Sequence, residues 1–241
     1  MVRTIRNAAF GLLWLALCAT AFGTSFTVLP RNFEVENGGG FPAYTSNQNN
    51  QFEVFCVDYA NGVSPPATYD ANISILSAGI GNTRYGTTPQ ASFLFQTVPA
   101  GQPTAGQTLG DAFNRYLLVG WLTTQYDFSA GANTGNRDIG IQNAIWDLLN
   151  VNGGSPQTGD VNVWLNNARA WENGQTAGQI NAFASNVRIY TSTDVAGLSG
   201  AARYVTGMQE MVNVVPEPAA MLLLGTGLIG IGAMARRRKR A

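Results

Sequence analysis

Histidine is absent from this chain of 241 residues, and charged residues in general are scarce. Without an imidazole, the chain cannot build a Ser-His-Asp or Cys-His catalytic group or a His-based metal site. The single lysine, Lys239, lies almost at the C-terminus, which excludes internal Lys-Asn isopeptide cross-links in the preceding region. The fourteen acidic residues include no pair that sequence singles out for glycoside hydrolysis. We therefore expect a non-enzymatic protein with no catalytic residue and no cofactor.

One short polar segment carries oxygen atoms of the kind that bind calcium. These belong to Asn133, Asn136 and Asp138. Their spacing does not match an EF-hand loop, and the same residue types are typical of a solvated turn. We therefore predict no metal site.

The C-terminal region, residues 215–241, combines an apolar stretch with a terminal basic cluster. Residues 219–235 carry no charged side chain, and a helix of this length would be about 26 Å long, at the short end of what crosses a bilayer. We predict a transmembrane helix over residues 219–235. The basic cluster, which we expect to stop transfer and to stay in the cytoplasm, consists of Arg236, Arg237, Arg238, Lys239 and Arg240.

Four residues precede this helix and complete an ordered set of elements. Val215, Pro216, Glu217 and Pro218, followed by the apolar stretch and the basic cluster, resemble the PEP-CTERM sorting signal of Gram-negative, exopolysaccharide-producing bacteria. The resemblance implies processing by an exosortase-type enzyme, and a membrane-anchored precursor that becomes a protein of the cell surface or extracellular matrix. An ordinary single-pass anchor behind a proline-rich stalk is the alternative. Both interpretations place the preceding chain outside the cell.

The N-terminus has the features of a secretory signal peptide. Two arginines precede the apolar run 8–19, and small residues near its end offer a cleavage site for signal peptidase. We predict a signal peptide over residues 1–23. A lipoprotein signal with Cys18 as the lipidated residue is the alternative, although Leu17 stands where that signal requires a small residue.

The segment between the two ends, residues 24–214, is predicted to be one secreted domain. It is rich in Gly, Asn, Thr and Gln and retains enough apolar side chains for a core. Because half of the fourteen basic residues lie in the signal peptide and the basic cluster, residues 24–235 keep seven arginines against fourteen acids. A region this negative is not expected to bind nucleic acid or anionic lipid through a basic patch.

Hydrophobic periodicity predicts strands first, helices in the middle and strands again at the end. The predicted strands cover residues 24–36, 51–59, 71–77, 92–98, 187–193 and 204–215. The predicted helices cover residues 109–125, residues 137–149 and a third segment that begins after Asp160. We therefore predict an α+β fold: a single β-rich ectodomain with an inserted helical bundle, flanked by an N-terminal signal peptide and a C-terminal membrane helix.

Two residues of this domain occupy unusual positions. After removal of the signal peptide, Cys56 is the only cysteine, so an exported chain carries a thiol without a disulfide partner of its own. Gln142 shares a predicted helix face with Ile145, Trp146 and Leu149, which places a long amide on an apolar surface. A buried amide that lacks hydrogen bonds costs about 1–3 kcal/mol, so both residues need an explanation.

The segments around these two residues resemble the Cys-Gln thioester domains of bacterial surface adhesins. Phe55-Cys56-Val57-Asp58 stands for the cysteine segment, and Ile141-Gln142-Asn143-Ala144 stands for the TQxA motif, with Ile141 in place of threonine. The resemblance implies that the Cys56 thiolate attacks the Gln142 side-chain carbonyl and expels ammonia, leaving an acyl donor that a nucleophile could open. The alternative is that Cys56 is a core residue and Gln142 a hydrogen-bonded polar group.

Two functional hypotheses follow. The first is a non-enzymatic, exosortase-processed surface or matrix protein associated with exopolysaccharide or biofilm. The second is a covalent adhesin in which a thioester between Cys56 and Gln142 reacts with a nucleophile-bearing surface target. Both hypotheses include the exosortase-type enzyme, signal peptidase and the membrane as partners, and the first adds extracellular polysaccharide. Neither includes nucleic acid.

Overall fold

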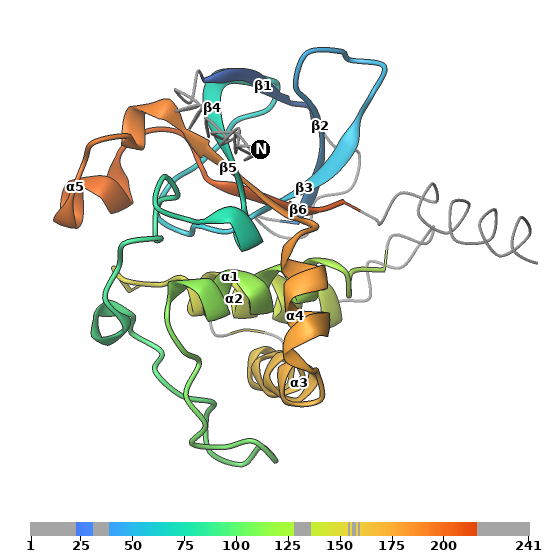
Figure 1. Cartoon of the computed structure of the whole chain (residues 1–241), viewed down its shortest axis with the longest axis vertical. Coiled ribbons are helices and arrows are strands. Elements are labelled where there is room, and N and C mark those ends of the chain that lie inside the picture. Colours follow the sequence, from blue (N-terminus) through green and yellow to red (C-terminus); the bar gives the residue numbers. More distant parts are fainter. Residues whose placement is uncertain are drawn as a thin grey trace, which may run out of the picture.

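Six β-strands form a closed antiparallel barrel in the computed structural model of the chain, which describes residues 23–30, 39–127, 136–153, 155, 158 and 160–215 (Figure 1). Around the barrel the strands follow the order β1-β2-β3-β6-β5-β4. Their bounds are Thr24–Val28 (β1), Gly40–Tyr44 (β2), Phe52–Cys56 (β3), Ala67–Ile75 (β4), Val187–Ser192 (β5) and Met211–Val214 (β6). Closure pairs every strand on both sides, which removes the exposed edges of an open sheet.

The interior of the barrel is filled by side chains from all six strands. Because side chains alternate along a strand, β3 directs Val54 and Cys56 into this interior, while Phe55 and Val57 pack in a separate cluster with the helices. The buried members of the interior cluster are Phe26, Val28, Phe41, Ala43, Val54, Cys56, Ala71, Tyr190 and Met211. The side chain of Cys56 is therefore part of the barrel core.

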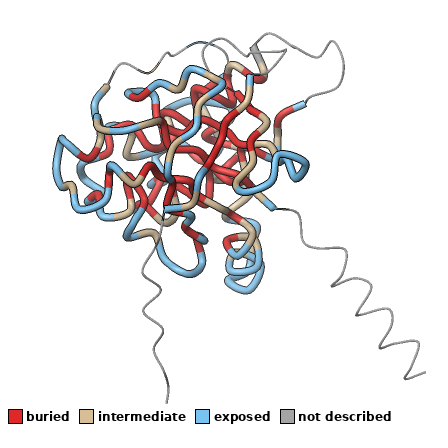
Figure 2. Tube along the Cα trace, turned by 90° about the horizontal axis from the view of Figure 1, so that it is seen from above, coloured by how far each residue is buried: buried red, intermediate tan, exposed pale blue. Residues whose placement is uncertain are grey.

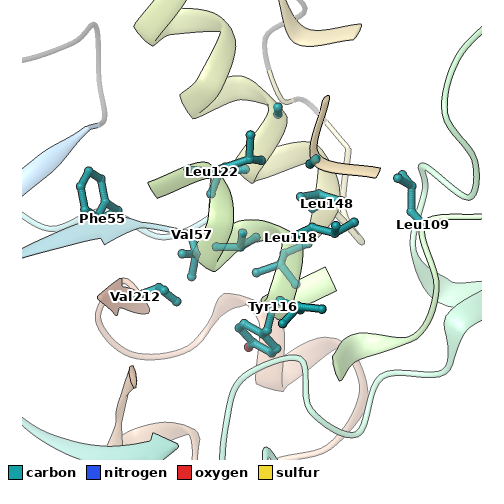
Figure 3. Close-up of a cluster of buried hydrophobic side chains, with 14 of the residues drawn as sticks. Phe55, Val57, Leu109, Tyr116, Leu118, Leu122, Leu148 and Val212 are labelled. Atoms are coloured by element: carbon teal, nitrogen blue, oxygen red, sulfur yellow. The ribbon is translucent and has the colours of Figure 1, made fainter. Parts of the chain in front are cut away.

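Helices cover the outer face formed by β3, β6 and β5 (Figure 1). Figure 3 shows Phe55, Val57 and Val212 from the barrel side beside Tyr116, Leu118 and Leu122. The α-helices are α1 (Ala112–Thr123), α2 (Asn136–Leu148), α3 (Val161–Asn173), α4 (Ala177–Ala184) and α5 (Gly200–Val205), with short 3-10 helices η1 (Leu76–Ala78), η2 (Gln90–Ser92) and η3 (Thr193–Val195). Buried residues accordingly concentrate in the middle of the molecule, with exposed loops around them (Figure 2).

Helix α1 is fixed against both the barrel and α2. Asp111 caps its N-terminus by accepting a hydrogen bond from the backbone N–H of Asn114. Gly120 allows a close approach to β5, because a Cβ at this position would lie 2.9 Å from Cγ2 of Val187. The buried Arg115 donates from Nη1 to the carbonyl of Leu148 at 2.6 Å, which ties α1 to the last turn of α2. The two helices that face the barrel are therefore held as a pair.

The predicted fold class is wrong. We expected an α+β fold with a β-rich ectodomain and an inserted helical bundle, whereas the strands close into a six-stranded antiparallel barrel accompanied by a few helices. Closure depends on the pairing of β1 with β4 and of β3 with β6, whose residues are far apart in the sequence. Hydrophobic periodicity shows which face of a strand is apolar but does not show which strand lies beside it.

Several individual elements also differ from the prediction. The predicted strand at residues 92–98 contributes only an isolated bridge between Thr97 and Thr108. The predicted strand at residues 204–215 is replaced by the end of α5 followed by the four-residue strand β6. Strand β2 was not predicted, because its sequence Gly-Phe-Pro-Ala-Tyr contains glycine and proline, which are depleted in strands. Part of the predicted strand 24–36 lies outside the described residues.

The predicted membrane-associated segments fall largely outside the described residues. This holds for the transmembrane helix at residues 219–235, for the basic cluster at residues 236–240, and for the signal peptide apart from Gly23. Within the part of the chain that the structure describes, no helix combines the length and the apolar character needed to span a membrane.

Candidate functional site

Gln142 lies in α2 and forms a buried junction with the barrel. Its Nε2 donates to the backbone carbonyl of Cys56 at 2.8 Å. Its Oε1 accepts from the backbone N–H of Gly39 at 2.7 Å and from the hydroxyl of Tyr126 at 2.9 Å. We call these four residues the amide junction. It joins α2 to the end of β3, to the segment before β2 and to the segment after α1, so the amide on the apolar helix face is satisfied at both its nitrogen and its oxygen.

The contact between Gln142 and Cys56 is a hydrogen bond to the backbone carbonyl of the cysteine, not to its thiol. The Cys56 thiol is free and buried, and its side chain belongs to the barrel core. Burial, and to a smaller extent the charge of Asp58, raises the pKa of this thiol above its ordinary value. A thiol with a raised pKa stays protonated at neutral pH and is a poor nucleophile. This arrangement favours a structural role for both residues.

A second buried polar group lies just after β3. The Nε of Arg84 contacts Oδ2 of Asp58 at 2.9 Å, and the backbone N–H of Arg84 donates to Oε2 of Glu210 at 2.7 Å. Glu210 also accepts hydrogen bonds from the hydroxyls of Tyr116 and Thr191. We call these five residues the charged cluster. None of them is more than 2% exposed, so their charges and hydroxyls are shielded from solvent and interact with groups inside the protein.

The guanidinium of Arg84 also holds the chain segment that leads into β6. Its Nη1 donates to the carbonyls of Arg203 and Thr206, and its Nη2 donates to the carbonyl of Met208, each at 2.8 Å. Arg203 returns a hydrogen bond from its Nε to the carbonyl of Arg84 at 2.9 Å. The segment after η1 and the segment before β6 are therefore fixed to each other by two arginines.

The two carboxyl groups of the charged cluster are unsuited to acid–base catalysis. Burial raises the pKa of both Asp58 and Glu210, while Arg84 and the hydrogen-bond donors around them partly oppose this shift. Paired carboxyl groups with raised pKa values can mark a catalytic site when a cleft exposes them. Here both side chains are sealed from solvent, so a substrate cannot reach them. Their arrangement supports a structural role.

A pocket of about 320 Å³ lies at the end of β3, next to the charged cluster. Tyr59 is 43% exposed, and its ring packs against Trp146 of α2 with the ring centroids 5.0 Å apart and the planes at 60°. The residues that line the pocket are Phe41, Cys56, Tyr59, Asn61, Gly62, Val63, Trp146 and Gln209. The pocket therefore combines aromatic rings with two side-chain amides.

The two amides of this pocket are held in defined orientations. The Nδ2 of Asn61 donates to Oδ1 of Asp58 and to the carbonyl of Tyr204, each at 2.8 Å. The Nε2 of Gln209 donates to the backbone carbonyl of Asp58 at 2.9 Å. Oδ1 of Asn61 and Oε1 of Gln209 have no hydrogen-bond partner among the described residues. Asp58 of the charged cluster thus holds the two side-chain amides that line the pocket.

The pocket and the charged cluster were not predicted from the sequence. In the sequence, Trp146 stands out only as a neighbour of Gln142 on an apolar helix face, and Asn61 belongs to no motif. Arg84 lies in a segment without periodicity, so nothing in its sequence context indicates that it is buried. Tyr59 and Asn61 follow a predicted strand, but this arrangement alone does not indicate a pocket.

The polar segment considered for calcium is described only in part. Asn133 lies outside the described residues, and Asp138 lies in the first turn of α2, where its Oδ1 contacts Nη1 of Arg137 at 3.1 Å. Among the residues that the structure describes, no group of three or more His, Cys, Asp or Glu side chains is placed to hold a metal ion.

The barrel leads directly into the segment that resembles a sorting signal. Strand β6 ends at Val214, and the backbone N–H of Val215 donates to the carbonyl of Asn186 at 2.9 Å. Pro216, Glu217 and Pro218 follow at once in the sequence and lie outside the described residues. The predicted sorting motif therefore begins at Val215, the first residue after the barrel wall.

Comparison with protein families identifies this segment. A family model described as the PEP-CTERM protein-sorting motif matches residues 214–239. The resemblance seen in the sequence is thereby confirmed, and the chain carries a PEP-CTERM sorting signal. This signal marks an extracellular protein that is targeted to an exosortase, and it implies export, a membrane-anchored precursor and processing by an exosortase-type enzyme.

The remaining comparisons do not extend this identification. No curated protein and no solved structure matches the chain. The resemblance to Cys-Gln thioester domains is not supported. In the structure the Cys56 thiol is free and buried, and Gln142 donates a hydrogen bond to the Cys56 backbone carbonyl.

Proposed function

We propose that this protein is a non-enzymatic component of the cell surface or extracellular matrix that associates with exopolysaccharide after exosortase-type processing. The observation that carries the proposal is the PEP-CTERM motif at residues 214–239. Two further observations support it. The excess of acids over arginines in residues 24–235 disfavours anionic partners, and the burial of the charged cluster disfavours acid–base chemistry.

The proposed precursor has three parts. Signal peptidase removes residues 1–23, residues 24–214 form the ectodomain, and residues 215–241 form the sorting tail. Within the tail, residues 219–235 span the membrane and the basic cluster stays in the cytoplasm. Processing then delivers the ectodomain to the surface or matrix of a Gram-negative bacterium.

The role of the tail is tested by the substitution Glu217→Ala in the full-length chain, expressed in an exosortase-containing bacterium. The parent should be shortened and found outside the cell. The variant should remain at full length in the membrane, because the apolar stretch still inserts while the recognition residue is lost. Asp70→Ala, an exposed acidic residue of β4, is the matched control and should behave as the parent. Equal size and location of Glu217→Ala and the parent would identify a plain membrane anchor.

The association with exopolysaccharide is tested on the secreted matrix. The mature protein should sediment with isolated polysaccharide and should be released when the polymer is enzymatically degraded. Incubation of purified protein with the polymer should leave the polymer length unchanged, as measured by size-exclusion chromatography. A protein that stays in the soluble fraction, or a polymer that becomes shorter, would contradict the proposal.

A further inference from the structure

We infer that the pocket beside Tyr59 and Trp146 binds an uncharged sugar ring of an extracellular polysaccharide, an inference that rests on the proposed association with exopolysaccharide. The pocket offers a stacking surface and two side-chain amides that are held in place, and no charged side chain lines it. Each of these features is set by residues whose positions the fold determines.

The stacking surface is the pair of rings at the pocket. Tyr59 exposes 43% of its surface although it is a large aromatic residue, and it is braced by Trp146 at a centroid distance of 5.0 Å. The face of an aromatic ring carries partial negative charge. The C–H groups on one face of a pyranose ring carry partial positive charge, so a sugar ring can pack flat on such a surface. Bracing by Trp146 limits the entropy that Tyr59 would lose on binding.

The acceptors are the amide oxygens of Asn61 and Gln209. Their nitrogens are engaged with Asp58 and with the carbonyl of Tyr204, at distances of 2.8–2.9 Å. Because Asp58 is itself fixed by Arg84 at 2.9 Å, the two acceptors are oriented before any ligand arrives. Sugar hydroxyls are donors that match acceptors of this kind, and a preorganised pair of acceptors favours binding over hydration.

The indole N–H of Trp146 is buried in the wall of the pocket. This residue lines the pocket and is only 3% exposed, and its Nε1 has no hydrogen-bond partner among the described residues. A buried N–H without a partner is costly. Because the atom itself is closed to solvent, a sugar hydroxyl can accept from it only if the pocket wall shifts around Trp146.

The absence of charge defines the class of sugar. Among the described residues, no Asp, Glu, Lys or Arg side chain lines the pocket, and burial keeps the Cys56 thiol protonated. No cation in the pocket lining is therefore available for a uronate, sulfate or phosphate group, and the excess of acids over arginines in residues 24–235 disfavours such ligands. The volume of about 320 Å³ is near the lower end of ligand pockets, which run from roughly 300 to 1,000 Å³. One sugar ring of a chain fits this space better than a long segment.

The inference is tested by calorimetric titration of the full-length chain, purified in a detergent without a sugar headgroup. The neutral probes are cellotetraose, maltotetraose and size-fractionated fragments of the source bacterium's own exopolysaccharide, and trigalacturonate is the anionic probe. We expect at least one neutral probe to bind and trigalacturonate not to bind. Absence of binding by every neutral probe, or preference for the anionic probe, would overturn the inference.

Variants of Tyr59 decide whether binding occurs at this pocket. Tyr59→Ala should weaken binding of the neutral probe about tenfold, whereas Tyr59→Phe should stay close to the parent because the ring is kept. Tyr44→Ala, at the far end of β2, is the matched control and should bind as the parent. In addition, the indole N–H resonance of Trp146 should shift on addition of the probe, with Trp146→Phe used for its assignment. Equal binding by Tyr59→Ala, or an unchanged Trp146 resonance, would show that the sugar binds elsewhere.

These experiments separate the site from the proposed function. A chain that sediments with exopolysaccharide and is processed normally, but binds equally well after Tyr59→Ala, retains the proposed function and loses the site. A chain that binds a neutral oligosaccharide through Tyr59 but is not found in the polysaccharide fraction retains the site and loses the proposed function.

Discussion

The charged cluster and the amide junction both connect the barrel to other segments through buried polar side chains, but they use different chemical groups. Both lie at the end of β3, and both connect the barrel to segments outside it. The charged cluster uses an arginine and two carboxyl groups, Asp58 and Glu210, whereas the amide junction uses one neutral side chain, Gln142. In both groups, buried polar side chains contact segments that are distant in the sequence: Arg84 contacts Glu210 and the segment before β6, and Gln142 contacts Cys56 and Gly39.

The difference lies in what happens when one partner is removed. Loss of a buried ion leaves an uncompensated charge in a region of low polarity, which costs about 3–5 kcal/mol. Loss of a neutral amide leaves unpaired N–H and C=O groups, at about 1–3 kcal/mol for each group that stays buried and unsatisfied. The charged cluster should also respond to pH, whereas the amide junction contains no carboxyl group.

The largest effect is expected for Arg84→Met. The substitution keeps much of the side-chain volume but removes the counter-charge of Asp58 and the hydrogen bonds to three carbonyls before β6. Urea denaturation should show a loss of about 3–5 kcal/mol in the free energy of unfolding. Arg169→Met is the control, because its ion pair with Glu172 lies within one helix and is partly exposed, so a loss of about 1 kcal/mol or less is expected. Equal losses for the two variants would remove the special role of the charged cluster.

A smaller effect is expected for Gln142→Ala, which breaks the amide junction. The carbonyl of Cys56, the N–H of Gly39 and the hydroxyl of Tyr126 all lose a partner, and the expected loss in the free energy of unfolding is about 2–4 kcal/mol. Gln51→Ala, at an exposed position before β3, should change stability little. A Gln142→Ala protein as stable as the parent would mean that water replaces the amide at no cost.

The pH dependence of stability should distinguish the two groups of residues. Burial raises the pKa of Asp58 and Glu210 above their ordinary values of 3.8 and 4.5. The stability that this shift contributes is fully present below those ordinary values and is lost as the pH rises through the raised values. Unfolding measured from about pH 4 to pH 8 should therefore show a decline in the parent and a flatter curve for Glu210→Gln. Gln142→Ala should lower the curve without changing its slope, and a flattened curve for that variant would contradict this division.

The smallest effect is expected when the native protein is treated with reagents that would react with a thioester or with the Cys56 thiol. Intact mass of the purified chain should show no loss of ammonia, and methylamine should add no mass, because Cys56 and Gln142 are joined only by a hydrogen bond. Alkylation of Cys56, followed by peptide mapping, should be slow in the native protein and fast after denaturation, since the thiol is buried and protonated. Release of ammonia together with uptake of methylamine would restore the thioester hypothesis.

Local sequence patterns predicted the positions of helices and strands better than they predicted which strands pair. The pattern after Thr108 predicted a helix at residues 109–125, and α1 covers Ala112–Thr123 with Asp111 as its cap. The alternation at residues 51–59 predicted a strand buried on both faces, and β3 packs Cys56 into the barrel and Phe55 against the helices. Neither pattern shows that β3 lies between β2 and β6, because strand pairing brings together residues that are distant in the sequence.

The candidate site was less predictable than the fold. Periodicity correctly placed Gln142 on an apolar helix face, but the same fact suited a thioester and a hydrogen-bonded core amide equally well. The hydrogen bonds that Gly39 and Tyr126 donate to Oε1 of Gln142 favour the core amide, and they appear only in the folded structure. The pocket depends on Asn61, Trp146 and Gln209, which come from three separate segments and share no sequence motif.

The sequence by itself determined where this protein is sent. The sorting signal is read as contiguous residues, with an order of motif, apolar stretch and basic cluster that needs no folded structure, and the family match at residues 214–239 confirms it. The tertiary structure alone decided the closure of the barrel, the burial of Arg84 and the inward direction of the Cys56 thiol. These depend on contacts between distant residues, whose energies arise only when desolvated groups find partners in the folded chain.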